Sequence, residues 1–402
     1  MKSNKYTFID LFAGCGGLSE GFYKQGFQGL THIEYDHHAC NSLRARIKHY
    51  GYPENEIGVL EKDITDKDII KQISLEVSNK DVDLLIGGPP CQSFSSLGRA
   101  KDENGMQNDP RNYLFESYEK ILNHFKPKIF VFENVVGLLS AKLGNEKIVN
   151  LILKKLGKSY NLIKDPNQMV LNSCDYGVPQ LRKRVILIGV RKDIEFDPRE
   201  IYNGIIKSHY KPDASKAEKM NKKKYVTVKE AISDLPSVKP GEGEKVINHT
   251  INSWNEYLSK IRSKNETILL DHVSRTHNQK DRKRYYEMSK NKWTFKELLE
   301  KKPSLNHIKQ RVFNNSYVVQ LWDKPARTII AHLYKDGNQF IHPDHKQERT
   351  ITPREAARLQ SFPDNFVFEG SRTQQYKQIG NAVPPLMAEA IAESIKKVLS
   401  KL

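Results

Sequence analysis

The stretch that decides the fold is YTFIDLFAGCGGLSEGFYKQGFQGLTHIEYD, residues 6–36. Its first seven residues, 6–12, are apolar enough to predict a buried strand. The glycine-rich AGCGG that follows leads directly into the helical pattern LSEGFYKQG, and THIEYD, residues 31–36, predicts a second strand. A strand, a helix and a strand in this order predict a βαβ unit with two parallel strands.

The same alternation continues along the chain. Residues 37–50 predict a second helix, and three further apolar runs predict strands, namely 81–88, 127–134 and 183–191. Strands that alternate with helices indicate an α/β fold with a largely parallel sheet. Near the end, residues 352–363 predict a helix that begins at a Thr-Pro pair, and residues 384–402 predict the last helix.

Length and composition limit the class of protein. The 402 residues are enough for two or three domains, and 38% hydrophobic residues still build a core. The sequence has neither a run of 18 apolar residues nor the apolar core of a signal peptide, so we expect no membrane-spanning helix and no secretion. Four cysteines without a CxxC pair indicate neither a disulfide framework nor a zinc site. We therefore expect a reducing cytosol and no metal.

The charge of the chain favours a polyanionic partner. Lys and Arg number 65 against 48 Asp and Glu, which gives a net charge of +17. Residues 191–350 carry 33 Lys and Arg against 21 Asp and Glu, whereas the other 242 residues carry 32 against 27. This excess points to nucleic acid, with a merely solvated lysine-rich surface as the alternative. Because periodicity also becomes poor after about residue 191, we predict a second, irregular domain there.

A glycine cluster, AGCGG at residues 13–17, lies where the first predicted strand meets the first helix. Glycines let the backbone approach a ligand closely, and a helix N-terminus presents free N–H groups. Glu34 ends the second predicted strand, where a carboxylate suits a ribose diol. Together with Asp63–Ile64, these residues favour an adenosine-type cofactor, although a plain tight turn explains the glycines alone. The spacing is not GxGxxG, which disfavours a dinucleotide oxidoreductase.

A second motif, GGPPCQSFS at residues 87–95, follows the strand predicted at 81–88. Cys91 lies just past a strand end, where open α/β sheets bind their ligands, and two prolines stiffen the approach to it. This position favours a nucleophilic cysteine that attacks as the thiolate, with a buried structural cysteine as the alternative. The polar stretch 95–112 predicts a mobile lid or an ordinary exposed loop.

Two further motifs supply polar groups at predicted strand ends. Glu133, in FENV, offers a carboxyl group that can pair with a heteroaromatic ring nitrogen. In QLRKR, residues 180–184, strand alternation puts the glutamine and both arginines on one face. Arginine suits carbonyl, carboxylate and phosphate groups. A helix cap for the glutamate and a solvated strand end for the arginines explain each motif equally well when it is taken alone.

Taken together and in order, nine blocks closely resemble the cytosine-C5 DNA methyltransferase family. The blocks are DLFAGCGG, IEYD, the DI of residues 63–64, GGPPCQSFS, DPRNYLF, FENV, QLRKR, REAARLQSFP and QIGNAVPP. The resemblance covers roughly residues 5–190 and 320–400. It implies a Rossmann-like, S-adenosylmethionine-dependent methyltransferase domain formed by 1–190 with 370–402, and a smaller, irregular target-recognition domain at 191–369.

The resemblance implies a role for each matched residue. Cys91 would attack C6 of a cytosine flipped out of double-stranded DNA, because a stacked base hides C5 and C6. Glu133 would hold the N3 edge and the amine of the cytosine, and Arg184 would contact O2 and steady Glu133, with Arg182 alongside. The cofactor-binding positions would be Phe12, Gly14, Gly16, Gly17, Leu18, Glu34, Tyr35, Asp63, Ile64, Pro89, Leu114, Asn381 and Ala382. The DNA contacts would be Gln92, Ser95, Arg327 and Thr328.

The resemblance also implies a setting and partners. We expect a bacterial cytoplasmic enzyme, held at the nucleoid by DNA, that either belongs to a restriction–modification system or stands alone. A cognate endonuclease would act on the same DNA site without a stable complex, and we expect a monomer because methylation of one strand at a time needs no two-fold partner. Leu97 leaves the residue that fills the flipped-base gap unassigned. By residue type only, the candidates for reading bases are Arg262, Arg275, His277, Arg282 and Arg284.

Two alternatives stay open. The tRNA-methylating branch of the family shares the PPC and ENV blocks, but its typical Cys-Phe-Thr tripeptide does not occur in this sequence. A catalytically silent DNA-binding relative is the other alternative, and the presence of Cys91, Glu133 and Arg184 argues against it. A small-molecule methyltransferase would not need a basic insert of this length.

Overall fold

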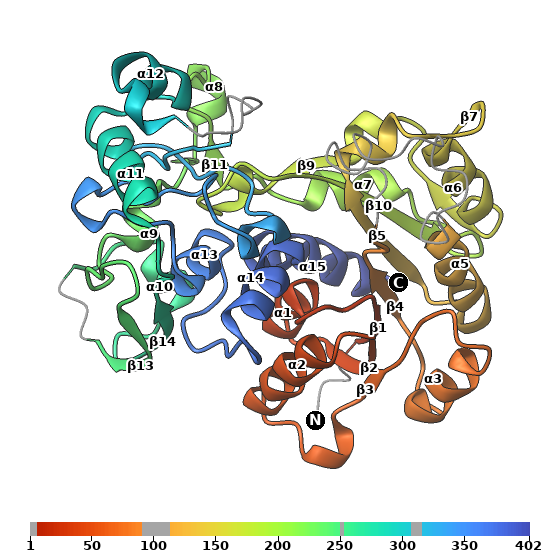
Figure 1. Ribbon diagram of the computed structural model, residues 1–402. Helices are drawn as coiled ribbons and strands as arrows, with labels where there is room; N and C mark the ends of the chain where they lie inside the picture. Colours follow the sequence, from red (N-terminus) through yellow and green to blue (C-terminus); the bar gives the residue numbers. More distant parts are fainter. Residues whose placement is uncertain (1–5, 91–112, 250–252, 307–315) are drawn as a thin grey trace. The chain divides into compact units, whose positions relative to one another are not determined.

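The computed structural model describes residues 6–90, 113–249, 253–306 and 316–402 (Figure 1). The chain divides into two compact units. The first unit comprises Met1–Asn172, Lys183–Lys207 and Pro385–Leu402, and the second unit comprises Ser173–Arg182 and Ser208–Pro384.

An eight-stranded sheet forms the centre of the first unit. Its strands are β1 (Thr7–Leu11), β2 (Gln28–Glu34), β3 (Val59–Glu61), β4 (Leu84–Gly87), β5 (Ile129–Val135), β8 (Tyr160–Leu162), β9 (Val170–Asn172) and β10 (Lys183–Arg191). They run in the order β3-β2-β1-β4-β5-β10-β8, with β9 beside β10. The first five strands pair in parallel, and β10 pairs antiparallel with β5, β8 and β9.

Helices cover both faces of this sheet (Figure 1). They are α1 (Gly17–Lys24), α2 (His37–His49), α3 (Ile69–Val77), α5 (Leu114–Phe125), α6 (Ile148–Leu156), α7 (Pro198–Gly204) and α15 (Pro385–Leu399). A small hairpin of β6 (Lys142–Leu143) and β7 (Glu146–Lys147) precedes α6, and short 3-10 turns lie at Glu54–Glu56, Val136–Leu139 and Pro166–Met169. Helices α1 and α15 meet at Gly21, where a Cβ atom would lie 2.3 Å from the backbone carbon of Ala388. Only glycine allows this close approach, which fixes the last helix against the first.

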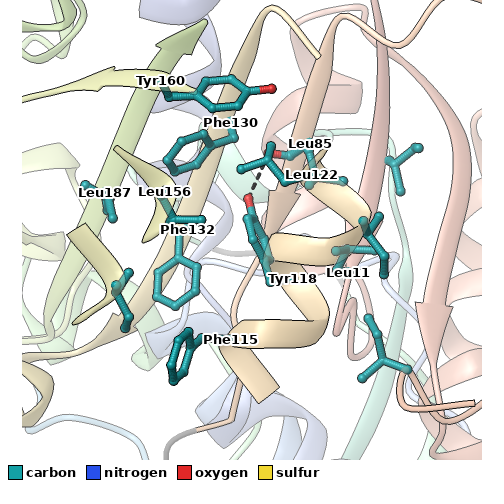
Figure 2. Close-up of a cluster of buried hydrophobic side chains, with 14 of the residues drawn as sticks. Leu11, Leu85, Phe115, Tyr118, Leu122, Phe130, Phe132, Leu156, Tyr160 and Leu187 are labelled. Atoms are coloured by element: carbon teal, nitrogen blue, oxygen red, sulfur yellow. Dashed lines mark hydrogen bonds between the residues drawn. The ribbon is translucent and has the colours of Figure 1, made fainter. Parts of the chain in front are cut away.

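The apolar core lies between the sheet and helices α3, α5 and α6. Figure 2 shows Phe130 packed against Tyr160 and Phe132 packed against Tyr118, with ring centroids 5.0 and 5.2 Å apart. The buried Tyr118 hydroxyl donates to the carbonyl oxygens of Leu85 and Val131, at 3.2 and 3.0 Å. Helix α5 therefore joins β4 to β5 by a hydrogen bond as well as by burial of apolar area.

The second unit is built from short elements. Its helices are α8 (Lys216–Lys219), α9 (Val228–Ile232), α10 (Leu258–Ile261), α11 (Gln279–Asn291), α12 (Phe295–Lys301), α13 (Pro353–Leu359) and α14 (Arg372–Asn381). Its strands form two-stranded sheets, β11 (His209–Tyr210) with β12 (Lys223–Lys224) and β13 (Gly243–Asn248) with β14 (Ile268–Val273). The 3-10 turns are η5 (Ser173–Tyr176), η6 (Pro303–Leu305), η7 (Ala331–Tyr334) and η8 (His345–Gln347). Regular structure is therefore sparse in the insert, as the poor periodicity predicts.

The predicted α/β class with a largely parallel sheet is confirmed. The units, however, divide the chain at other residues than the predicted domain boundaries near 190 and 370. Residues 173–182 lie in the second unit because they run beside residues 326–328, where the Leu181 amide donates to the Ala326 carbonyl at 2.8 Å. Helix α14 also lies in the second unit, and α7 in the first. The assignment of a target-recognition domain stays a prediction.

Candidate active site

The predicted site motifs follow the strands at which the sheet reverses its order. Strands β2 and β3 lie on one side of β1, and β4 and β5 lie on the other. In open α/β sheets, ligands bind outside the carboxyl ends of the strands at such a switch point. Here those ends are Leu11 and Gly87, and they lead directly into AGCGG and GPPC. Because β1 and β4 are paired neighbours, the fold places AGCGG next to residues 88–90.

The turn between β1 and α1 requires its glycines. Phe12, Gly14 and Gly16 all have positive φ, at 58°, 56° and 91°, and Gly16 is the N-cap of α1. A Cβ atom at Gly16 would also lie 2.6 Å from the Leu43 side chain. Backbone N–H groups at the start of α1 are thereby brought to the carboxyl end of the sheet, where they suit a polar ligand.

Glu34, the last residue of β2, binds the backbone of this turn through its carboxylate. Its carboxylate accepts the N–H groups of Gly14 at 2.8 Å, Tyr35 at 2.9 Å and Asp36 at 2.8 Å. Burial raises the pKa of Glu34, and these three N–H groups offset part of that rise. The neighbouring Tyr35 ring is 70% exposed. A buried carboxylate beside an exposed aromatic ring fits the ribose and the base of an adenosine group.

The other predicted cofactor residues are spread over both units. Asp63 is exposed, and its carboxylate accepts the amide and the hydroxyl of Thr65 at 2.8 and 2.7 Å. Ile64 and Pro89 are buried, and Leu114 begins α5. Gly17 and Leu18 lie in the first turn of α1, and Asn381 and Ala382 lie at the end of α14, in the second unit.

Asp10 is a further polar group of this region that the sequence did not single out. Its side chain is 1% exposed, and the Ser19 hydroxyl donates to it. Burial raises the pKa of Asp10 to about 8, the charge of Glu34 adds to the rise, and the Ser19 hydrogen bond opposes it. Asp10 is therefore mostly protonated at pH 7. The sequence could have pointed to Asp10, because it is the first residue of the DLFAGCGG block.

Glu133 and Arg184 form an ion pair across β5 and β10. The two strands are antiparallel, with Arg184 opposite Val135 and Ile186 opposite Glu133. The Arg184 Nε donates to the Glu133 carboxylate at 2.9 Å, and both side chains are largely buried. Burial lowers the pKa of Arg184, and the adjacent carboxylate opposes the shift. The structure thus brings together two of the residues that the sequence assigned to the cytosine.

The segment that leads to Cys91 is fixed to the same strand. A Cβ atom at Gly88 would lie 2.7 Å from the Glu133 carboxylate oxygen, so a larger residue there would displace this carboxylate. The buried Asn134 amide donates to the Pro89 carbonyl at 3.1 Å, a contact that the sequence reasoning missed although Asn134 stands in the quoted FENV motif. The predicted nucleophile Cys91, the predicted DNA contacts Gln92 and Ser95, Leu97 and the predicted lid lie outside the described residues.

Arg182 does not lie beside Arg184 on an exposed strand face. Strand β10 begins at Lys183, and Arg182 is 1% exposed in the second unit. Its guanidinium donates to the carbonyls of Ile329 at 2.6 Å and Gly380 at 3.1 Å. The predicted DNA contacts lie next to this point: Arg327 is exposed, and the Thr328 hydroxyl donates to the Leu181 carbonyl at 2.6 Å. Arg182 thus binds backbone carbonyls of the second unit, and its predicted catalytic role alongside Arg184 stays a prediction.

The structure corrects part of the set of base-reading candidates that was chosen by residue type. Three of them are buried arginines bonded within the second unit: Arg262 to Asp364, Arg275 to the Leu333 and Lys335 carbonyls, and Arg284 to Asp281 and the Leu305 carbonyl. Arg282 pairs with Glu348 at 2.6 Å, and His277 accepts the Thr350 amide. The three buried arginines hold the unit together and are not available to DNA bases, whereas the 41% exposed Arg282 and the half-buried His277 stay candidates.

Two absences hold for the part of the chain that the structure describes. No cluster of three or more His, Cys, Asp or Glu residues there is arranged to hold a metal ion. None of its helices is long and apolar enough to cross a membrane.

The fold and the site define a Rossmann-like methyltransferase, and similarity to known proteins agrees. Residues 6–397 match the family model of the C-5 cytosine-specific DNA methylases. The Type II methyltransferase M.DdeI of Desulfomicrobium norvegicum is 37% identical over 97% of this chain and 88% of its own length. The Type II methyltransferase M.Bpa9945I of Bacillus paralicheniformis is 33% identical over 98% of this chain and 99% of its own length.

Solved structures show the same fold. A prophage-encoded chain from E. coli, described as a candidate DNA modification methyltransferase, superposes with a TM-score of 0.72 at 25% identity and covers 98% of this chain and 100% of its own. The Dnmt2 methyltransferase of S. pombe, at 16% identity, has a TM-score of 0.53 over 99% of each chain and shows the fold alone. The chain belongs to the C-5 cytosine-specific DNA methylase family, and the predicted DNA cytosine-5 methylation is confirmed at the level of that family.

Proposed function

We propose that the chain transfers a methyl group from S-adenosylmethionine to C5 of a flipped cytosine in a short double-stranded DNA site. The observation that carries the proposal is the Glu133–Arg184 pair beside Gly88–Pro89, the backbone that leads to Cys91. The carboxylate and the guanidinium lie at the end of the sheet from which the chain continues to Cys91, and we assign all three groups to one base.

Each residue of this site has a separate role on the cytosine. The Cys91 thiolate adds to C6, and the electrons of the C5–C6 bond move onto C5, which becomes nucleophilic. Glu133 binds the N3 edge and the exocyclic amine, while Arg184 contacts O2 and orients Glu133. Because both groups are largely buried, they stabilise charge on the ring more strongly than exposed groups would. Loss of the C5 proton and departure of the thiolate then restore the pyrimidine.

The turn after β1 fits the methyl donor. When bound, S-adenosylmethionine supplies an electrophilic methyl group on a sulfonium. Glu34 would accept hydrogen bonds from its ribose, and Tyr35 would contact the adenine. The glycine turn from Gly14 to Gly17 would pass close to the methionine end. The remaining residues of the proposed cofactor site are Phe12, Leu18, Asp63, Ile64, Pro89, Leu114, Asn381 and Ala382.

The biological role is part of the proposal. Two relatives that match over nearly the whole chain are named Type II methyltransferases, which supports protection of host DNA in a bacterial restriction–modification system. The enzyme would act in the cytoplasm as a monomer, on the same site as any cognate endonuclease and without a stable complex with it. Elution as a stable dimer in gel filtration would contradict the monomer.

The test is base-resolution sequencing of 5-methylcytosine in a methylation-free bacterial host that expresses the chain. We expect methylation at one short motif, and none with Cys91→Ala. Cys174→Ala is a matched control, because it removes a buried thiol whose acceptor, the Gln180 carbonyl, keeps the Ser173 hydroxyl as a donor. Methylation by the Cys91 variant near the normal level would reject the nucleophile, and an unmethylated genome with methylated host tRNA would transfer the proposal to tRNA.

A second experiment tests the ribose contact. Glu34→Ala should weaken binding of S-adenosylhomocysteine about 10- to 100-fold, since hydrogen bonds to a charged group contribute about 1.5–3 kcal/mol. Glu61→Ala is the control, because Glu61 lies opposite Glu34 on β3 but its carboxylate faces His37 and Arg44 instead. An unchanged dissociation constant for the Glu34 variant in calorimetry would reject the role.

A further inference from the structure

Residues 180–182 hold the loop that carries Arg327 and Thr328. The Ala326 amide donates to the Pro179 carbonyl at 2.8 Å, and the Thr328 hydroxyl donates to the Leu181 carbonyl at 2.6 Å. Both backbone groups of Ile329 are bound by side chains from the same segment. Its N–H donates to the Gln180 amide oxygen at 2.6 Å, and its carbonyl accepts the Arg182 guanidinium at 2.6 Å.

The same two side chains also reach the end of α14. The second arm of Arg182 donates to the Gly380 carbonyl at 3.1 Å. The Gln180 amide nitrogen donates to the Gln360 side chain at 2.9 Å, and Gln360 in turn donates to the Ile379 carbonyl at 2.6 Å. Gly380 is followed in the sequence by Asn381 and Ala382, which the proposed function assigns to the cofactor.

Backbone contact makes this connection stiff. A Cβ atom at Gly380 would lie 2.3 Å from the Ala331 amide nitrogen, so the helix end and the loop after Ile329 touch directly. Gln180 and Arg182 are 0% and 1% exposed, and a buried carbonyl that loses its donor costs about 1–3 kcal/mol. Displacement of residues 326–329 without residues 380–382 would break hydrogen bonds that Gln180 and Arg182 make to these segments. The two segments are therefore expected to shift together.

We propose that Arg182 and Gln180 are positioning residues that couple the DNA-contacting loop at 326–329 to the cofactor-contacting segment at 380–382. The inference rests on the proposed function for both segments. When DNA phosphate fixes the loop, the bonds of Arg182 fix the Gly380 carbonyl, and Asn381 is held ready for the cofactor. Coupling between binding sites is reciprocal, so bound cofactor should strengthen DNA binding by the same factor.

A purely structural role for a buried arginine is the competing explanation, and the second unit contains a matched example. Arg354 is 0% exposed and donates to the carbonyls of Leu270, Pro363 and Phe366. None of these acceptors lies in either coupled segment. Arg354→Lys therefore removes a buried guanidinium from the same unit without touching the proposed connection.

The experiment measures the dissociation constant of S-adenosylhomocysteine with and without a duplex that contains the site found by methylation mapping. The ratio of the two constants is the coupling factor. We expect a factor of about 5–100 in the unchanged chain. It should fall to nearly 1 in Arg182→Lys, because a single ammonium group cannot span both carbonyls. Arg354→Lys should keep the factor within about twofold, although both variants lose thermal stability.

A second variant keeps the test decisive if Arg182→Lys fails to fold. Gln180→Met has nearly the same shape but removes the acceptor of the Ile329 N–H and the donor to Gln360, so its coupling factor should also fall. The inference is overturned if the unchanged chain shows no coupling, if both variants at 180 and 182 keep it, or if Arg354→Lys loses it equally. A chain that binds neither probe would instead reject the proposed function.

Discussion

The core of the first unit is mainly apolar, whereas the second unit contains most of the buried arginines of the described chain. In the first unit, helices α3, α5 and α6 cover the sheet with apolar side chains, as in the cluster of Figure 2. In the second unit the most deeply buried large side chains include arginines. Its buried arginines are Arg182, Arg262, Arg275, Arg284, Arg349, Arg354 and Arg358. No lysine is buried among the residues that the structure describes.

The difference follows from the amount of regular structure. Short helices and two-stranded sheets leave many carbonyls without a backbone partner, and a planar guanidinium with five donors can bind several of them. Arg354, for example, binds three carbonyls, and Arg358 binds Asp364 through two nitrogens at 2.9 and 2.7 Å. Arginine therefore replaces part of the hydrogen bonding that a large sheet supplies in the first unit.

The largest effect is expected where this charge is removed. Asp364 is 0% exposed and also accepts Arg262 at 3.0 Å, so Asp364→Asn removes the carboxylate partner of Arg262 and one of the two carboxylate partners of Arg358, which keeps Asp234. Breaking such a pair costs about 3–5 kcal/mol. All three tryptophans, Trp254, Trp293 and Trp322, lie in the second unit, so tryptophan fluorescence during urea unfolding reports on it alone.

The control for this substitution is Asp213→Asn. Asp213 lies in the same unit but is 79% exposed and 3.7 Å from Lys211, and we expect a change within about 0.5 kcal/mol. An equal loss of unfolding free energy in both variants would show that the buried network does not stabilise the second unit.

The sequence predicted the first unit well because its signals are local. Buried strands appear as apolar runs, and the turn after β1 appears as glycines whose positive φ the structure shows at Gly14 and Gly16. The network of the second unit has no such signal. Arg262 and Asp364 are 102 residues apart in the sequence. Residue type alone does not distinguish a buried arginine from an exposed one. For this reason Arg262, Arg275 and Arg284 were misassigned to DNA.

The candidate site shows the same division. Glu133 and Arg184 could be identified because each lies in a motif at a strand end, and the antiparallel pairing of β5 with β10 brings them together. The connection from Arg182 to Ile329 and Gly380 could not, because alternation along a strand places a residue on a face but does not say what covers that face. Strand β10 begins only at Lys183, so Gln180 and Arg182 precede it and strand alternation does not apply to them.

A smaller effect is expected at acid pH. Burial alone raises the pKa of Asp364, but Arg358, Arg354 and Arg262 outweigh it and lower the pKa to about 2. In the unfolded chain the value is about 3.9, so stability present above pH 4 is lost as the pH falls toward 2, by about 2 kcal/mol. Glu355 shifts in the same direction, because Arg349 and His342 outweigh its burial.

The acid prediction is checked by urea unfolding with tryptophan fluorescence between pH 5 and pH 2. The unchanged chain should lose unfolding free energy more steeply than Asp364→Asn, which has no carboxylate left to protonate at this position. Parallel curves for the two chains would exclude Asp364 as a source of the acid sensitivity.

The smallest loss is expected when the same substitution is made in the first unit. Asp10 is as deeply buried as Asp364, but none of the arginines in the described ranges pairs with it, and its pKa is raised to about 8. The folded carboxyl is therefore neutral where the unfolded one is ionised, so the unchanged chain loses stability as the pH rises from about 4 to about 8.

Asp10→Asn keeps an acceptor for the Ser19 hydroxyl, and its amide does not ionise in this pH range. It should cost no stability at pH 5 and should be the more stable chain at pH 8, as measured by hydrogen exchange of β1 and α1. A loss at pH 8 as large as that of Asp364→Asn would mean that Asp10 is buried as a charged group, and the contrast between the units would fail.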